Sequence, residues 1–370
     1  MRVRLPFRPR AVDFDGCAAP TSTLYFAPDG AVRACCVNHA YVYGRIGEQS
    51  IREIWDGARV QALRDAVAAG DYSLGCQECG SRFDAGGRAW SNAPQFDVFA
   101  GRPSGRHPLR MEFILSITCN LQCEMCSGEW SSAIRTQREG RPPLRSPYGD
   151  DFFEELREFL PHLEVASFLG GEPFLAREQR RVMDLMLEIG FDQPVSVVTN
   201  GTQWNDRVAR YLRELPISVT VSVDGVTAET NEMLRAGTRH DEVMENVDAM
   251  HDVVRSRGGD LAYQFCLMHQ NWHEFGRLLV AAEAKGRPVF VMTVSTAGFS
   301  LWDLPIDELR PIVEALDAES GRVRRHLRRN RAVWDRELSR LHAHLERLVE
   351  GDTPVWVSVS QSDRKDDLAR

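Results

Sequence analysis

Ile117-Thr118-Cys119-Asn120-Leu121-Gln122-Cys123-Glu124-Met125-Cys126 places three cysteines on one short loop with the spacing C-x3-C-x2-C. Soft thiolates select zinc, copper(I) or iron–sulfur clusters. A closed structural site is normally completed by a fourth Cys or His a short distance along the chain, whereas the next cysteine here is Cys266. Three thiolates leave one iron of a four-iron cluster open, so the spacing predicts a cluster that binds a small molecule. A zinc knuckle or a redox loop is the plainer alternative.

Composition excludes several classes of protein. The 370 residues have a formal net charge of −8, and acidic and basic side chains are interspersed. We therefore expect no polyanion-binding face and no nucleic-acid partner. No apolar run approaches the roughly 18 residues of a membrane span, and Met1 to Arg10 lacks the apolar segment of a secretory signal. A cytoplasmic protein is expected, in which clustered cysteines indicate metal sites.

Downstream of the three cysteines the chain alternates β-branched runs with amphipathic helical stretches. Parallel strands joined by helical crossovers close into a partial barrel, with the chemistry at the carboxyl ends of the strands. The pattern predicts an α/β fold with a partial (β/α)6 TIM-like barrel. The expected strands are Arg110–Thr118, Val165–Gly170, Pro194–Thr199, Ser218–Asp224, Leu261–His269 and Val289–Thr296. Long helices are expected over Pro305–Glu350, and a closing strand or extended tail over Val355–Ser360.

The cysteine loop resembles the signature of the radical S-adenosylmethionine (SAM) superfamily. In that family the open iron chelates the amino and carboxylate groups of SAM. The resemblance implies that Cys119, Cys123 and Cys126 bind a [4Fe–4S] cluster, and that Met125 lies beside the adenine.

Three further motifs resemble SAM-binding elements of the same family. Gly170-Gly171-Glu172-Pro173 resembles its GGEP turn, in which glycines let the backbone approach the ligand. Thr199-Asn200-Gly201 resembles its TNG element. Ser222 and Asp224, followed by Arg235, resemble a segment whose serine and arginine contact SAM, and an arginine fork can pair with a carboxylate. Read alone, the first two motifs are turns, and Arg235 is a solvated helix residue.

A second cysteine set precedes the barrel. The turn Pro28-Asp29-Gly30 predicts a hairpin, and an apolar stripe predicts a helix over Ser50–Ala69. Together with Cys76-x2-Cys79 these elements resemble the SPASM/twitch auxiliary-cluster domain, which usually follows the barrel. We expect a small N-terminal α+β auxiliary domain at 1–98, the barrel at 109–300 and a helical extension at 301–370.

The resemblance implies one auxiliary [4Fe–4S] cluster. Its expected ligands are Cys17, Cys35, Cys76 and Cys79, with Cys36 as the alternative to Cys35. A structural zinc ion stays open as an alternative, because spacing alone does not separate zinc from iron. The module would then be a structural or partner-docking element.

The family's reaction implies the function. A one-electron reductant such as flavodoxin or ferredoxin reduces the cluster, SAM is cleaved, and a 5′-deoxyadenosyl radical takes hydrogen from an unactivated carbon. Strand alternation places Gln264, Cys266 and Met268 on one face, expected to be the lumenal one. A lumenal thiol can return hydrogen from the opposite side, which predicts an epimerase with Cys266 as the catalytic residue.

The expected substrate is a small-molecule or oligosaccharide natural product, such as a sugar of an antibiotic, and a peptide is possible. Two alternatives stay open. In the first, the enzyme is a dehydrogenase or a peptide-modifying maturase that uses the auxiliary cluster as electron acceptor. In the second, Cys266 is a small residue of the hydrophobic core without a catalytic role.

Overall fold

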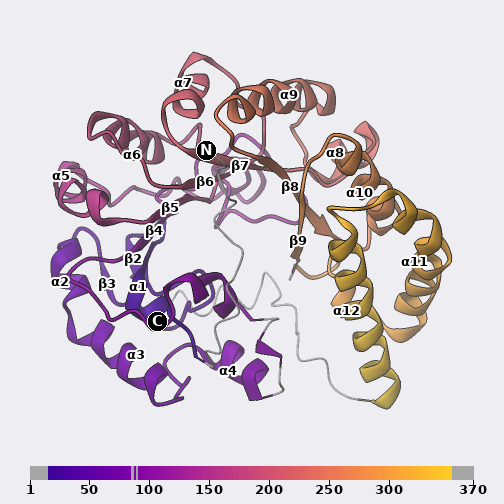
Figure 1. Cartoon of the computed structure of the whole chain (residues 1–370), viewed down its shortest axis with the longest axis horizontal. Coiled ribbons are helices and arrows are strands. Elements are labelled where there is room, and N and C mark those ends of the chain that lie inside the picture. The colour runs from indigo at the N-terminus through magenta and orange to yellow at the C-terminus, as the bar shows by residue number, and fades with distance from the viewer. Residues whose placement is uncertain (1–15, 85–86, 89–90, 295, 352–370) are drawn as a thin grey trace.

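One curved sheet organises the molecule. The structure, a computed structural model, describes residues 16–84, 87–88, 91–294 and 296–351. Within these residues nine strands form one sheet in the order β3-β2-β1-β4-β5-β6-β7-β8-β9. Figure 1 shows the strands lining an open ring, with helices around its outside. This arrangement is the partial barrel that the alternating sequence pattern predicts.

The six expected barrel strands are present and parallel, each one to five residues shorter than expected. They are β4 (Arg110–Phe113), β5 (Val165–Phe168), β6 (Val195–Thr199), β7 (Ile217–Ser222), β8 (Leu261–Leu267) and β9 (Val289–Thr293). Three N-terminal strands precede them: β1 (Thr23–Phe26), β2 (Ala31–Arg33) and β3 (Gly44–Arg45).

The helices cover the outside of the ring. Those of the N-terminal region are α1 (Ala19–Ser22), α2 (Ile51–Trp55), α3 (Ala58–Ala68) and α4 (Gln77–Asp84). Those of the barrel are α5 (Asp150–Phe159), α6 (Arg177–Glu188), α7 (Asp206–Glu214), α8 (Ala228–Leu234), α9 (His240–Ser256) and α10 (Phe275–Ala284). The expected C-terminal helices are α11 (Ile306–His326) and α12 (Arg331–Glu350). The closing strand expected over Val355–Ser360 lies outside the described residues.

The N-terminal region adds a seventh parallel strand to the barrel. Its hairpin forms as expected, with β1 antiparallel to β2, but β1 also pairs in parallel with β4. Phe26, Phe113 and Phe168 stack across β1, β4 and β5, and all three are fully buried. Each such burial stabilises the fold by roughly 1.5–3 kcal/mol. The sheet therefore continues across the boundary expected near residue 100, although the domain limits themselves stay a prediction.

The helix expected over Ser50–Ala69 is broken into α2 and α3. Ser50 and Glu53 form a capping box at the start of α2, and the break falls at Gly57, where a Cβ would lie 2.9 Å from the carbonyl oxygen of Glu53. The apolar stripe survives the break, since its six members are buried: Ile51, Ile54, Trp55, Val60, Leu63 and Val67.

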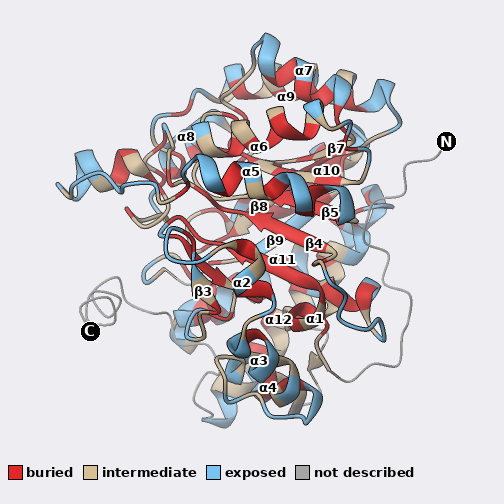
Figure 2. Cartoon of the chain, turned by 90° about the vertical axis from the view of Figure 1, so that its left-hand side faces the viewer, coloured by how far each residue is buried: buried red, intermediate tan, exposed pale blue. Residues whose placement is uncertain are grey.

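Strand alternation separates the core from the lumen. Along β8, Tyr263, Phe265 and Leu267 belong to the main core under the helices, and Phe265 stacks on Phe275 of α10. Gln264 and Cys266 are half-buried on the opposite face. Figure 2 shows the same contrast, with buried strands inside and exposed outer surfaces on the helices. The lumenal direction expected for Gln264 and Cys266 is confirmed.

None of the helices in the described ranges is both long enough and apolar enough to cross a membrane.

Candidate active site

The three-cysteine loop follows β4 at the carboxyl edge of the sheet and is held by the segment that comes after it. The Cys119 amide donates to Ser132 Oγ (3.1 Å), and Ser132 Oγ donates to the Cys119 carbonyl (3.2 Å). Ser131 Oγ donates to the carbonyl of Leu121 (2.7 Å). The loop conformation is therefore set locally, by hydrogen bonds to residues a few positions along the chain.

Arg138 is the strongest of these anchors. Its guanidinium donates to the carbonyl oxygens of Cys126 (2.7 Å), Cys123 (3.4 and 3.5 Å) and Gln122 (3.3 Å). It lies on a π-helical turn, Ile134–Arg138, a geometry that often accompanies functional sites. Sequence motifs did not reveal this residue, because a single arginine on a helix carries no pattern.

Gly170 and Gly171 bring the next turn against the cysteine loop. Both have positive φ, 77° and 50°. A Cβ on Gly171 would lie 2.5 Å from the carbonyl oxygen of Thr118, and one on Gly170 would lie 2.3 Å from Ile114 Cγ2. Side chains are excluded at both positions, so the glycines allow the close backbone approach that the motif predicts.

Glu172 lies under this turn and is fully buried. Its carboxylate accepts from the Asn200 amide (2.7 Å), Thr199 Oγ1 (2.8 Å) and the Phe174 amide (3.1 Å). Burial raises the pKa of Glu172 to about 7, although these hydrogen bonds act to lower it. The Glu172 carboxylate thus connects the Gly170–Pro173 turn to the Thr199–Gly201 element. A direct contact between Glu172 and SAM stays a prediction.

Asn200 connects this network to the cysteine loop. Its Nδ2 donates to Asn120 Oδ1 (3.0 Å) and lies 3.8 Å from Cys119 Sγ. The two elements are far apart in sequence, so the fold brings them together at the carboxyl ends of β4 and β6, where the barrel rule places chemistry.

Asp224 and Arg235 form a buried ion pair on the other side of the loop. Arg235 Nη2 lies 2.7 Å from Asp224 Oδ2, and Arg235 Nη1 lies 4.0 Å from Cys123 Sγ. Ser222, at the end of β7, is also buried. Arg235 is 8% exposed, which rules out a solvated helix residue.

Met125 and Cys266 lie beside the same cluster of side chains. Both pack, partly buried, against Leu234, Met268 and Val294, and the Met125 carbonyl accepts from Thr296 Oγ1 (2.8 Å). The Cys266 amide donates to Asp224 Oδ1 (2.7 Å). Burial, followed by the charge of Asp224, raises the pKa of the Cys266 thiol, so this group carries its proton.

The second cysteine set gathers around one pocket in the N-terminal region. Cys17, Cys35, Cys76 and Cys79 all line it, together with Asn38, whose Nδ2 lies 3.3 Å from Cys76 Sγ. Burial raises the pKa of the Cys17, Cys35 and Cys76 thiols, a cost that binding to iron offsets because the metal deprotonates its ligands.

Cys36 does not line this pocket. It packs instead against the small lumenal cluster of Tyr25, Ala27, Ala31 and Ile114, and Asn92 Nδ2 lies 3.6 Å from its sulfur. Both cysteines lie in the bend that follows β2, where Cys35 lines the pocket and is buried while Cys36 is half-buried. Cys35 therefore stays the predicted ligand, since it lines the pocket and Cys36 does not.

Both cysteine sets fit clusters. Among the described residues no three His, Cys, Asp or Glu side chains converge on a single metal ion. A four-iron cluster does not require such convergence, because each thiolate binds a different iron. The four thiols around one pocket match a fully ligated cluster, and the loop with three thiols matches a cluster with one open iron.

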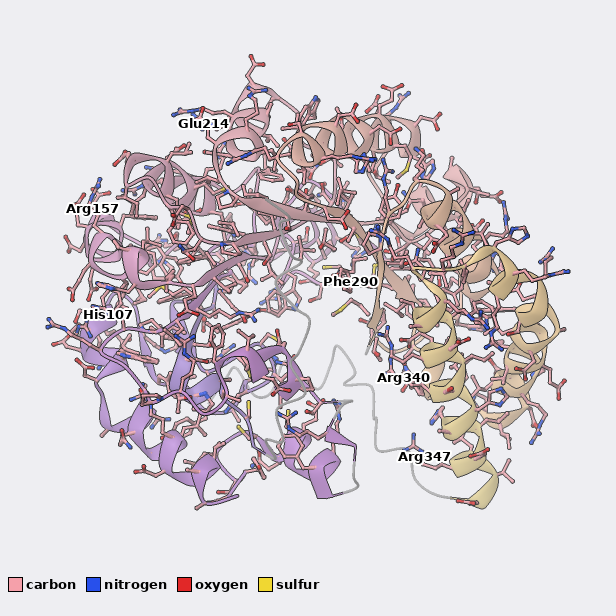
Figure 3. The ribbon with its side chains drawn as sticks, viewed as in Figure 1. His107, Arg157, Glu214, Phe290, Arg340 and Arg347 are labelled. Carbon is pink, nitrogen blue, oxygen red and sulfur yellow. The ribbon has the colours of Figure 1, made fainter. Side chains whose placement is uncertain are left out.

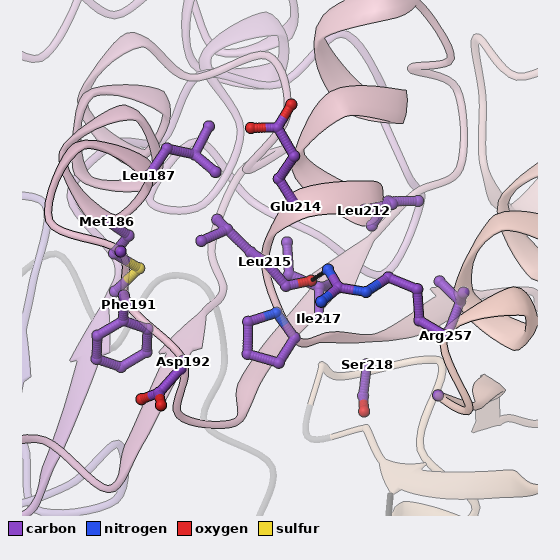
Figure 4. Close-up of a pocket in the computed structure, with 14 residues that line it drawn as sticks. Met186, Leu187, Phe191, Asp192, Leu212, Glu214, Leu215, Ile217, Ser218 and Arg257 are labelled. Carbon is purple, nitrogen blue, oxygen red and sulfur yellow. Dashed lines mark hydrogen bonds between the residues drawn. The ribbon is translucent and has the colours of Figure 1, made fainter. Parts of the chain in front are cut away.

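Another pocket lies at the opposite edge of the sheet, where α6, α7 and α9 end (Figure 4). Phe191, Leu215 and Ile217 line it, and Arg257 crosses it to donate to the Leu215 carbonyl (3.0 Å). This edge holds the amino ends of the strands, which in barrels of this kind serves stability.

Two family profiles match the chain. Residues 113–282 match the profile described as the radical SAM superfamily, and residues 17–80 match SPASM, described as an iron-sulfur cluster-binding domain. The chain therefore carries a radical SAM domain. It carries its SPASM domain ahead of the barrel, and the comparison with curated proteins gives no significant match.

Several solved structures are similar to the chain at low identity. They include SuiB of Streptococcus suis bound to precursor peptide SuiA (16% identity, TM-score 0.42, 67% of this chain and 60% of that one). Another is anSMEcpe with bound AdoMet (16%, 0.43, 56% and 59%). A third is a radical SAM methyltransferase from Sphaerobacter thermophilus (17%, 0.36, 56% and 62%). The chain thus spans about 60% of the length of the first of these structures.

The two domains imply three cofactors: SAM, the SAM-binding [4Fe–4S] cluster and an auxiliary [4Fe–4S] cluster. The residues that would hold them are those described above, in the three-cysteine loop with its adjoining turns and in the four-cysteine pocket.

Proposed function

We propose that this radical SAM enzyme is an epimerase of a sugar or another natural product, with Cys266 as the hydrogen donor. The observation that supports it is the position of the Cys266 thiol, which lies on the lumenal face of β8, packs against the same side chains as Met125 of the cluster loop, and does not line the auxiliary pocket. When bound, the cluster and SAM supply a 5′-deoxyadenosyl radical that removes one hydrogen atom from the substrate.

The thiol completes the reaction. The S–H bond of Cys266 breaks, its hydrogen forms the new C–H bond from the opposite side, and the carbon is inverted. The sulfur radical that remains takes up one electron and one proton to restore the thiol. A flavodoxin or ferredoxin is the proposed source of the electron, and solvent supplies the proton. The raised pKa of the thiol favours this role, because only the protonated form can donate hydrogen.

The surroundings of Cys266 support this assignment. Its amide is held by Asp224, which is itself held by Arg235, so the strand end is fixed relative to the proposed SAM site. A hydrogen donor must be positioned in this way, because the transfer requires the two reacting atoms to be in near contact.

Product analysis tests the proposal. In deuterated water the wild type should place one deuterium at the inverted carbon of a glycoside substrate. Cys266→Ala should still cleave SAM and remove the substrate hydrogen, but it should not release the epimer. Cys36→Ala is the matched control, since Cys36 also lies outside the auxiliary pocket, and it should behave as the wild type.

A dehydrogenase or a peptide-modifying maturase that passes an electron to the auxiliary cluster is the competing function. It would release a product two mass units lighter than the substrate without deuterium, or a modified peptide, and Cys266→Ala would then retain activity. Either result would overturn the epimerase proposal.

A further inference from the structure

The exposure of lumen-facing side chains rises from one side of the barrel to the other. On β4 and β5, Glu112 and Ser167 are 2% and 1% exposed. On β7 and β8, Thr220 and Gln264 are half-buried. On β9, Phe290 and Met292 are 49% and 48% exposed. The open part of the lumen therefore lies against β6 to β9.

The N-terminal region fills the other side. Tyr25 of β1 faces the lumen next to Glu112 and is 3% exposed. Glu112 pairs with Arg110 at 2.9 Å, and Arg110 lies over the ring of Phe96. The Glu112–Arg110 pair on this wall is thus neutralised and buried.

The strand residues of the open wall carry no charge, and the Asp224–Arg235 pair beside Cys266 is buried. The inward-facing residues in the described part of β6 to β9 are all neutral: Ser196, Val198, Ser218, Thr220, Ser222, Ala262, Gln264, Cys266, Phe290 and Met292. Within the described chain the side chains of Thr220 and Gln264 make no hydrogen bond to another residue. Half-buried amide and hydroxyl groups without partners are costly unless a ligand or water satisfies them.

An apolar patch adjoins these polar groups. Strand register places Phe290 next to Gln264, and Met292 next to Cys266. In Figure 3, Phe290 lies on β9 beside the middle of the ring. A ligand at Cys266 would meet an aromatic ring on one side, and neutral hydrogen-bonding groups from Gln264, Ser222 and Thr220 on the other.

We infer that the open half of the lumen is the substrate site, and that it takes a neutral, hydroxyl-rich small molecule such as a sugar or glycoside. A sugar ring has apolar C–H faces, which can pack against the ring of Phe290. Its hydroxyl groups can form hydrogen bonds with Gln264, Ser222 and Thr220. Small-molecule sites commonly combine an apolar surface with a few placed polar groups. This inference rests on the proposed function, because it takes Cys266 as the reacting end of the site.

Calorimetry on the SAM-bound holoenzyme without reductant tests it, using glucose, glucosamine, gluconate and N-acetylalanine methylamide as probes. Glucose should bind more tightly than the cation, the anion or the blocked amino acid. Phe290→Ala should weaken glucose binding roughly fivefold to tenfold, because the aromatic contact is lost. Val98→Ala, which shortens an exposed apolar side chain on the N-terminal side of β4, is the control and should leave the affinity unchanged.

A change of charge sharpens the test. Gln264→Glu keeps the size of the side chain but adds a negative charge. It should therefore weaken glucose binding and strengthen binding of the positively charged glucosamine. Equal affinity of the wild type for glucose, glucosamine and gluconate, or tighter binding of N-acetylalanine methylamide, would overturn the inference. No turnover occurs in this experiment, so failure of the Cys266 proposal would show only in product analysis, and failure of the substrate site only here.

Discussion

The two cysteine sets reach their positions by opposite routes. Cys119, Cys123 and Cys126 lie on one loop whose shape is set by nearby residues, above all Ser132 and Arg138. Cys17, Cys35, Cys76 and Cys79 come from separate segments and meet only where the hairpin, α1 and α4 pack together. A local site can be read from its spacing, whereas an assembled site needs the fold to choose its members.

Removing the local set should have the largest effect. The triple variant Cys119→Ala, Cys123→Ala and Cys126→Ala should lose all SAM cleavage and retain about half of the roughly eight irons that two four-iron clusters imply. Iron analysis after anaerobic reconstitution, together with assay of 5′-deoxyadenosine, measures both. Full iron content in this variant would place the SAM-binding cluster elsewhere. Stoichiometric zinc with only about four irons in the wild type would contradict the auxiliary cluster.

A matched pair of variants tests the assembled set. Cys35→Ala should reduce the iron content to about four per chain, because Cys35 faces the auxiliary pocket. Cys36→Ala should keep about eight, because Cys36 packs against the lumenal cluster instead. Iron analysis and electron paramagnetic resonance of the reduced proteins distinguish the two. The reverse result would show that the pocket is built around Cys36.

Arg235 tests how the barrel completes the local site. Arg235→Ala should weaken SAM binding roughly tenfold to a hundredfold, since a charge-assisted hydrogen bond contributes about 1.5–3 kcal/mol. The substitution also leaves the buried Asp224 carboxylate unpaired, which is itself destabilising. The double variant Asp224→Asn with Arg235→Ala removes that penalty and should still bind SAM weakly. Wild-type affinity in the double variant, measured by calorimetry, would exclude a contact between Arg235 and SAM.

Arg138 should have the smallest effect, one confined to the cluster. Its guanidinium donates to the carbonyl oxygens of Cys123 and Cys126. Nearby charges and hydrogen bonds influence the reduction potential of an iron–sulfur cluster. Arg138→Gln should make the potential of the SAM-binding cluster more negative in a redox titration followed by paramagnetic resonance, while Arg138→Lys should shift it less.

Arg135→Gln is the control for this titration. Arg135 lies on the same π-helical turn but donates to the carbonyl of Pro142, so its loss should leave the potential unchanged. An unchanged potential in Arg138→Gln would show that Arg138 only holds the loop in place and does not influence the cluster.

The sequence alone determined the barrel and the two domain families, and it predicted the local site. The six strands are predicted by apolar runs, and the helical crossovers between them make the strands parallel. The glycine turn at Gly170 and Gly171 and the three-cysteine loop each lie within one short segment, so a local sequence pattern suffices to identify them. Even the lumenal direction of Cys266 followed from alternation along one strand.

Only the tertiary structure decided how separate segments meet. It made β1 a parallel neighbour of β4, which hairpin signals do not specify because strand pairing across the chain is non-local. It turned Cys35 rather than Cys36 toward the auxiliary pocket, and it placed Arg138 on the loop carbonyls. It also closed one half of the lumen and left the other half open. The burial of a lumen-facing residue depends on which distant segments cover its strand, and the sequence of the strand does not specify those segments.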